Sequence, residues 1–254
     1  MGIGGAAIAT GLGYSVTAVV GLLVFSRKKS LLHFKKPVCR FQVLWNAASN
    51  GCSEMATALV TGIITMMFNW TMLHYVGEDG VAAVTIIMYV LMFASSLYTG
   101  YSYGVAPMLS FYYGEQNQEK LKKLVAVSLR VIAVISVVTV VLSFGMTKPL
   151  VSIFARPENP VYDLAVTGNR ICTMALFFIG FNIFASGMFT ALSNGVVSAV
   201  LAFSRSFVFM LITMIALPIL LGVNGIWLAT PAAELMALTL SAGMFFKYRK
   251  RYEY

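Results

Sequence analysis

Charged side chains are scarce in this sequence: they make up 11% of its 254 residues, whereas hydrophobic residues make up 59%. A soluble domain carries roughly 25% charged residues, so this chain lacks the charge to cover a surface that faces water. The shortage excludes a soluble globular protein. Together with a mean hydropathy of +0.83, it predicts an integral membrane protein whose main partner is the lipid bilayer.

Cysteine is scarce as well. Cys39, Cys52 and Cys172 have neither a metal-binding nor a CxxC spacing, and an odd, scattered set does not predict a disulfide framework. Metal-binding motifs, nucleophile elbows and phosphate-binding loops are also missing. The sequence therefore indicates neither an enzyme nor a nucleotide-driven pump. We expect no metal and no cofactor, apart from an ion whose gradient drives transport.

Long hydrophobic runs are what the sequence does have. A membrane-spanning helix needs about 20 mostly apolar residues, and seven runs satisfy this. They cover residues 4–25, 42–76, 81–112, 121–144 with an amphipathic continuation to 154, 161–192, 196–221 and 225–246. Because no alternating ten-residue pattern of barrel strands is present, the predicted fold is all-α, with seven transmembrane helices.

The net charge of +9 is distributed in a way that predicts membrane orientation. Basic residues gather at 27–40, 120–123 and 247–251, whereas the opposite side of the predicted membrane has only Lys148 and Arg156. By the positive-inside rule, the N-terminus lies outside and the C-terminus lies in the cytoplasm. Orientation in a bilayer explains the positive charge without a nucleic-acid partner.

Two similar nine-residue segments lie near the ends of the chain, at 2–10 and at 222–230, and each begins an apolar run. If this is a repeat, residues 1–26 are the last helix of an otherwise missing first lobe. Residues 27–40 are then a basic cytoplasmic linker, and residues 41–254 a second lobe of six helices. Seven helices also fit a receptor-like protein, although a retinal protein needs a lysine within its last helix, and 225–246 has none.

Polar residues form a stripe along the predicted helix at 42–76. They recur every three or four residues, which places them on one helical face, and Glu54 lies at the edge of that face. The stripe consists of Asn46, Asn50, Ser53, Thr57, Thr61, Thr65 and Asn69. Such a face either forms hydrogen bonds with another helix or lines a water-filled cavity. Because an intramembrane carboxylate is costly and usually functional, the stripe with Glu54 favours a transport cavity in which Glu54 couples a cation.

Two further polar residues lie within apolar runs, and each has two readings. Asn182 either stabilises helix packing through hydrogen bonds or contacts a ligand. Glu234 either lines the cavity or pairs with a neighbouring hydroxyl or amide. Both are kept as candidates for the substrate cavity. Arg205 lies about two turns inside the run at 196–221, where we expect its long side chain to reach the cytoplasmic surface.

Short motifs occur in a characteristic order along the whole chain. They lie at residues 2–10, 50–54, 82–83, 100 and 104, 107–114, and 222–231. In this order they resemble the multidrug and toxic compound extrusion (MATE) family. The resemblance implies two six-helix lobes with the substrate between them, of which this sequence supplies the sixth helix and the second lobe.

The resemblance also implies a function. Such transporters export small cationic lipophilic drugs across the plasma membrane in exchange for H⁺ or Na⁺, and Glu54 matches the carboxylate that binds the coupling cation. Some members pair it with an aspartate, but the run at 161–192 has only Asp163 at its end, so the ion stays open. A first lobe would have to act in trans. The alternatives are a non-transporting membrane fragment or receptor-like protein, and a relative of lipid-linked oligosaccharide flippases.

Overall fold

The computed structural model describes residues 2–26 and 41–252, except for the side chains of residues 2, 3, 6, 17, 43–58, 250 and 251. The described residues form helices and short connections, with no strand among them. The elements are α1 (Gly2–Ser26), α2 (Phe41–Tyr75), α3 (Glu78–Gly114), α4 (Gln118–Gly145), α5 (Thr147–Ser152), α6 (Pro160–Cys172), the 3₁₀ turn η1 (Thr173–Ala175), α7 (Leu176–Ala191), α8 (Gly195–Phe203), the π-helical segment η2 (Ser204–Phe209), α9 (Met210–Leu221) and α10 (Val223–Tyr252).

The helices follow the apolar runs that the sequence predicts, which confirms the all-helical membrane class. Within the described residues, six helical spans are long and apolar enough to cross a membrane. The remaining predicted span coincides with α2, of which many side chains are not described. The predicted linker at 27–40 lies outside the described residues. Two runs that the sequence predicts as continuous are interrupted, by η1 and by η2.

The chain forms two compact units, Met1–Ser53 and Glu54–Tyr254. In the first unit, α1 is a single apolar helix whose side chains are almost all exposed. Its serine hydroxyls are satisfied locally, because Ser15 donates to the Gly11 carbonyl and Ser26 to the Leu22 carbonyl. An exposed apolar helix whose two serine hydroxyls are bonded within the helix is suited to a lipid environment.

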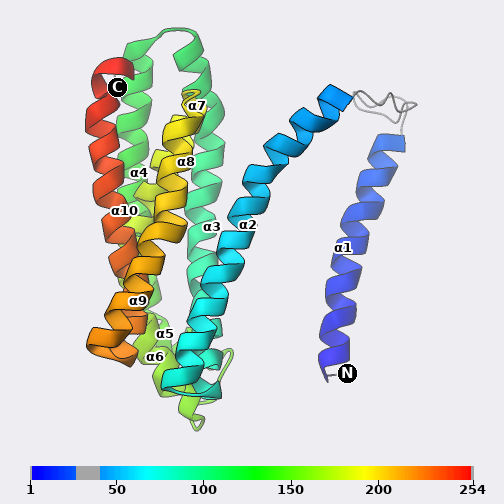
Figure 1. Cartoon of the computed structure of the whole chain (residues 1–254), viewed down its shortest axis with the longest axis vertical. Helices are drawn as coiled ribbons and strands as arrows, with labels where there is room; N and C mark the ends of the chain where they lie inside the picture. Colours follow the sequence, from blue (N-terminus) through cyan, green and yellow to red (C-terminus); the bar gives the residue numbers. More distant parts are fainter. Residues whose placement is uncertain (1, 27–40, 253–254) are drawn as a thin grey trace. The chain divides into compact units, whose positions relative to one another are not determined.

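The second unit is a helical bundle with α7 at its centre (Figure 1). This helix packs against α3, α4, α8 and α10, while α9 packs mainly against α10. The end of α2 joins the bundle through Ile64, Phe68 and Met72, which recur every four residues and are all buried. Buried side chains at that spacing form one helical face, so α2 contacts the bundle along a single stripe.

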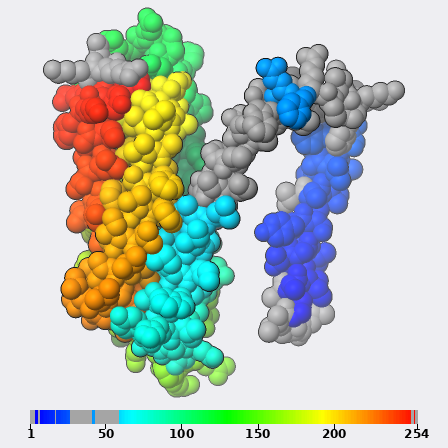
Figure 2. All heavy atoms as spheres, in the orientation of Figure 1, coloured from blue at the N-terminus to red at the C-terminus, as the bar shows by residue number. Residues whose placement is uncertain are grey.

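Two hydrophobic clusters fill the bundle. The first core gathers residues from α2, α3, α5, α6, α9 and the beginnings of α7 and α10, including Ile87, Val151, Leu176, Met214 and Trp227. The second core gathers residues from α4, the end of α7, α8 and the end of α10, including Leu121, Ile132, Phe184, Phe189 and Tyr252. Figure 2 shows α8 (yellow) and the end of α10 (red) side by side on one face of the bundle.

The connection between α9 and α10 depends on glycine. Gly222 has φ of +59°, a left-handed conformation that side chains with a Cβ adopt reluctantly. A Cβ on Gly225 would overlap the Leu217 carbonyl group. The two glycines therefore allow α10 to turn back directly along α9.

Candidate functional site: a buried polar network between the two cores

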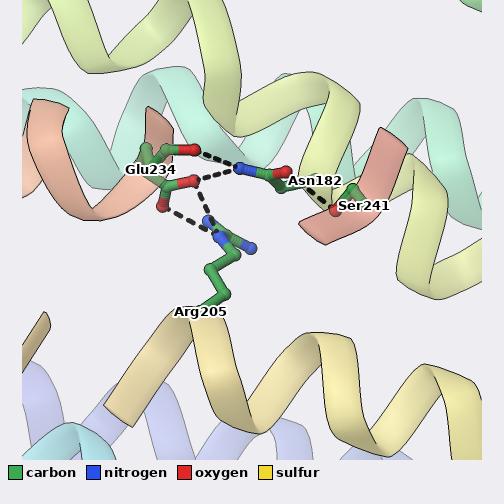
Figure 3. A network of polar contacts seen from close by, with 4 residues as sticks. All are labelled: Asn182, Arg205, Glu234 and Ser241. Atoms are coloured by element: carbon green, nitrogen blue, oxygen red, sulfur yellow. Dashed lines mark hydrogen bonds and ion pairs between the residues drawn. The ribbon is translucent and has the colours of Figure 1, made fainter. Parts of the chain in front are cut away.

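Four polar side chains from three helical segments meet inside the second unit (Figure 3). Nδ2 of Asn182 donates to Oε2 of Glu234 at 2.8 Å and to the Glu234 backbone carbonyl at 2.9 Å. Nε of Arg205 donates to both Glu234 carboxylate oxygens, at 2.8 and 3.0 Å. The Ser241 hydroxyl donates to Oδ1 of Asn182 at 3.0 Å. The network thus joins α7, η2 and α10.

The network lies at the boundary between the two cores. Along α7, Asn182 falls between Ile179 of the first core and Phe184 of the second. Glu234 likewise lies on α10 between Ala229 of the first core and Tyr252 of the second. Arg205 lies between Leu201 of the second core and Met214 of the first. A single polar layer therefore separates two apolar regions.

Burial explains why the partners are needed. Glu234 is 7% exposed and Asn182 is 2% exposed. An isolated carboxylate in this setting would carry a large desolvation penalty, which an arginine and an amide offset through direct hydrogen bonds. The carboxylate and the amide are both engaged, so the arrangement holds three helices together and neutralises the acid.

The position of Arg205 differs from the prediction that its side chain reaches the cytoplasmic surface. The structure instead directs the guanidinium inward to Glu234. The physical reason is that a carboxylate within reach offers a stronger partner than the distant headgroup region. For Glu234, one of the two sequence readings was pairing with a neighbouring amide, and this is the contact that Asn182 makes.

Local backbone features position the network. Pro231 lies within α10 and has no N–H to donate to the carbonyl of Trp227. The thiol of Cys172 donates to this carbonyl at 3.3 Å, so α10 continues past the proline with the carbonyl satisfied. On the other side, Arg205 is the second residue of the π-helical segment. Such a segment widens one turn of a helix and occurs frequently at functional sites.

The polar stripe of α2 is only partly described. The side chains of Glu54, Asn46, Asn50, Ser53 and Thr57 lie outside the described part of the chain, so their predicted roles stay predictions.

The described part of that stripe is Thr61, Thr65 and Asn69. Thr61 and Thr65 are exposed, Asn69 is half-buried, and the Thr65 hydroxyl donates to the Thr61 carbonyl at 2.9 Å. On the same helix, Ile64 and Phe68 are buried in the first core. Because Thr61 and Phe68 are seven residues apart, they lie on nearly the same side of the helix, so exposure changes along the length of α2 and not only around it.

Sequence reasoning identified Asn182 and Glu234 individually but missed Arg205 as the partner of Glu234. A signal for this pair was present, because an arginine and a glutamate lie inside consecutive apolar runs. Intramembrane charges of opposite sign usually pair. In residues 2–26 and 41–252, no three His, Cys, Asp or Glu side chains come together in a way that could hold a metal ion.

Comparison with known proteins assigns the family. The MatE family model matches residues 55–215, which is more than half of the chain and includes Asn182 and Arg205. The chain belongs to the MATE family. The family model, the helical bundle and the predicted membrane spans thus agree, and this MATE protein is a multi-pass membrane protein.

Individual relatives agree with this assignment. The multidrug export protein MepA of Staphylococcus haemolyticus is 24% identical over 97% of this chain and 54% of its own length. The chain thus spans about half the length of the curated relative it matches. An inward-facing multidrug resistance MATE transporter of the MOP superfamily is similar in fold, with 20% identity, a TM-score of 0.83, and coverage of 99% of this chain and 59% of that one.

A third relative shows how the fold can vary in function. A MOP-superfamily transporter from Pyrococcus furiosus has a TM-score of 0.76 with 19% identity, and the match covers 99% of this chain and 57% of that one. For that protein, the reversed polarity of the binding pocket suggests a different function. The similarity to solved structures therefore establishes the fold of this MATE chain, whereas its substrate has to be argued from its own residues.

Proposed function

We propose that this chain forms half of a multidrug antiporter of the plasma membrane, which exchanges small cationic lipophilic compounds for H⁺ or Na⁺. One observation carries the proposal: two hydroxyl residues of the predicted polar stripe, Thr61 and Thr65, are exposed, whereas Ile64 and Phe68 of the same helix are buried in the bundle. Glu54 precedes Thr61 by about two turns in the predicted stripe. Polar groups of a membrane helix that its own bundle does not cover are suited to a water-filled cavity or to contact with a second lobe.

The coupling role falls to Glu54 because the other candidate carboxylate is already engaged. Both oxygens of Glu234 accept hydrogen bonds from Arg205, and one also accepts from Asn182. A cation would have to displace the guanidinium to bind there. Asp163 lies at the end of its predicted span, so Glu54 is the remaining acid in the interior of one. A carboxylate in a cavity wall can exchange a proton for another cation.

Transport by this mechanism requires two lobes. The chain covers 54% of the length of MepA, so the proposed cavity lies between the helices of this chain and a lobe equivalent to the rest of that relative. That lobe acts in trans if it is a separate polypeptide. In the proposed orientation the N-terminus lies outside and the end of α10 lies in the cytoplasm, which places Lys122 and Arg249 on the cytoplasmic side.

The test is efflux of ethidium from bacteria that lack their own drug exporters. The chain is expressed alone and together with the part of MepA that it does not cover. Glu54→Gln is expected to reduce efflux to the level of cells without the chain, while membrane insertion, measured by protease protection, is unchanged. Replacing external Na⁺ with K⁺, or dissipating the proton gradient, identifies the coupling ion.

Glu119→Gln is the matched control, because Glu119 is an exposed acid in the first turn of α4 and should leave efflux unaffected. Normal efflux by Glu54→Gln would rule out its role in coupling. If wild-type cells with both lobes inserted show no efflux of any cationic dye, a non-transporting membrane protein is the better description.

A further inference from the structure

A groove of about 450 Å³ opens where α4, α7 and α10 come together. Its volume lies within the roughly 300–1,000 Å³ of ligand sites in proteins. Its lining is apolar except for Lys122, Ser241 and Arg249. The groove touches the polar network through Ser241 alone, and the proposed transport mechanism gives it no role.

The two cations of the groove lie at one end of the bundle. Lys122 is in the first turns of α4, and Arg249 is near the end of α10. Leu121 and Tyr252 line one neighbouring pocket, which shows that the beginning of α4 and the end of α10 are adjacent. The groove is therefore amphipathic along its length, with positive charge at this end and hydrocarbon beyond it.

Neither cation is neutralised by the described part of the protein. Lys122 and Arg249 are both exposed, and within residues 2–26 and 41–252 the one ion pair joins Arg205 to Glu234. Lys123 and Lys247 follow and precede them on the same helices. A cleft that carries charge of one sign attracts ligands of the opposite sign.

The remaining lining matches an aliphatic chain. Val125 and Leu129 on α4 face Phe181 on α7 and Phe245 on α10 across the groove, and none of these side chains offers a hydrogen-bonding group. The three helices belong to spans that are apolar and long enough to cross a membrane. Hydrocarbon tails are therefore present around the groove at high concentration, and their burial is favourable by about 0.8 kcal/mol per CH₂ group.

We propose that this groove is a binding site for an anionic phospholipid. The headgroup phosphate lies between Lys122 and Arg249, and one acyl chain follows the apolar wall toward Ser241. A cationic drug would be repelled by the two basic side chains. A second copy of this chain would bring the same positive charges to the contact, so it is also a poor occupant. Basic pockets between transmembrane helices commonly bind anionic headgroups.

The test measures lipids bound to the full chain purified in detergent. Native mass spectrometry records binding of dioleoylphosphatidylglycerol and dioleoylphosphatidylcholine, titrated separately. We expect one saturable phosphatidylglycerol and weaker, non-saturating phosphatidylcholine. Lys122→Gln and Arg249→Gln should each weaken phosphatidylglycerol binding about fivefold, since one basic residue near an anionic lipid contributes about 1 kcal/mol.

Matched variants separate the groove from general surface charge and from misfolding. Lys123→Gln removes a neighbouring positive charge that does not line the groove and should leave selectivity intact. Ala126→Phe fills the groove from an exposed position and should abolish selective binding, whereas Val127→Phe enlarges the next exposed residue, outside the lining, without effect. The melting temperature of each variant checks that the fold is retained.

The possible results decide the proposal independently of transport, because the readout is lipid occupancy rather than efflux. Equal binding of the two phospholipids would overturn it. The same loss in Lys123→Gln as in Lys122→Gln would show general surface attraction instead of a site. Displacement of the lipid by inorganic phosphate alone, at millimolar concentration, would show that the site recognises a small anion and not an acyl chain.

Discussion

The two cores of the bundle are built from different contacts. In the first core, backbone proximity brings large side chains against glycine: a Cβ on Gly168 would lie 2.6 Å from Ile87 and 2.8 Å from the Trp227 ring. In the second core, aromatic rings pack edge to face, with Phe189 at 5.8 Å from Phe245 and 5.7 Å from Tyr248 between ring centroids. At Gly168 the first core thus has no room for added volume, whereas at the end of α10 the second core is a cluster of aromatic rings in edge-to-face contact.

The polar network lies at the boundary between these two kinds of packing. Helices that approach through glycine are closely spaced, whereas edge-to-face aromatic pairs keep ring centroids about 4.5–7 Å apart and contribute about 0.5–1.5 kcal/mol each. Asn182, Arg205 and Glu234 lie where the two kinds of packing meet. The network therefore joins α7, η2 and α10 through direct hydrogen bonds at this boundary.

The largest expected effect comes from breaking this boundary. Glu234→Ala leaves Arg205 without its carboxylate and should lower the free energy of unfolding by about 3 kcal/mol. Unfolding in mixed micelles by titration with sodium dodecyl sulfate measures the change. The double variant Arg205→Met/Glu234→Met should lose less than the single variant, because no unpaired charge remains. A single variant as stable as the wild type would show that the pair does not join the cores.

Added volume in the first core should have the next largest effect. Gly168→Ala places a methyl group against Ile87 and Trp227, and overpacking of this kind costs about 1–3 kcal/mol. The same micelle titration reports the loss, and tryptophan fluorescence reports displacement of the Trp227 ring. Gly104→Ala is the control, because a Cβ there meets no atom within 4 Å. If Gly168→Ala and Gly104→Ala had the same free energy of unfolding, the tight packing inferred at Gly168 would be wrong.

The smallest effect is expected at the end of the second core. Tyr252→Phe keeps the ring that packs on Phe189 but removes the hydroxyl that accepts a hydrogen bond from Asn194 at 3.0 Å. A loss of about 0.5–1 kcal/mol is expected for a neutral hydrogen bond, visible as a small decrease in melting temperature. Tyr103→Phe, at a residue that is 74% exposed, should leave the melting temperature unchanged. A large loss in Tyr252→Phe would mean that polar contacts, and not stacking, stabilise this core.

Much of the fold follows from the sequence because spanning helices are encoded by local hydropathy. Each predicted run corresponds to helical structure, with most ends displaced by a few residues. The interruptions at Thr173–Ala175 and Ser204–Phe209 were not foreseen, because neither segment contains the glycine or proline that usually signals a break. Those irregularities arise from contacts between helices, which the order of residues along one helix does not reveal.

The candidate site was predictable residue by residue but not as an arrangement. Asn182 and Glu234 stood out because polar groups within apolar runs are expensive, whereas the role of the polar stripe on α2 stays a prediction. That Arg205 turns inward depended on a carboxylate 29 residues further along the chain. Similarly, nothing in the local sequence indicates that Lys122 of α4 and Arg249 of α10 line one groove.

The tight glycine connection between α9 and α10 has a consequence for biosynthesis. Consecutive helices joined so closely can enter the bilayer as one hairpin, with Arg205 facing Glu234 across it. An arginine entering alone at the middle of a span costs about 2.5–3.5 kcal/mol on translocon scales. Because its counter-charge arrives on the very next helix, the hairpin can enter the hydrocarbon with the Arg205–Glu234 pair already neutralised.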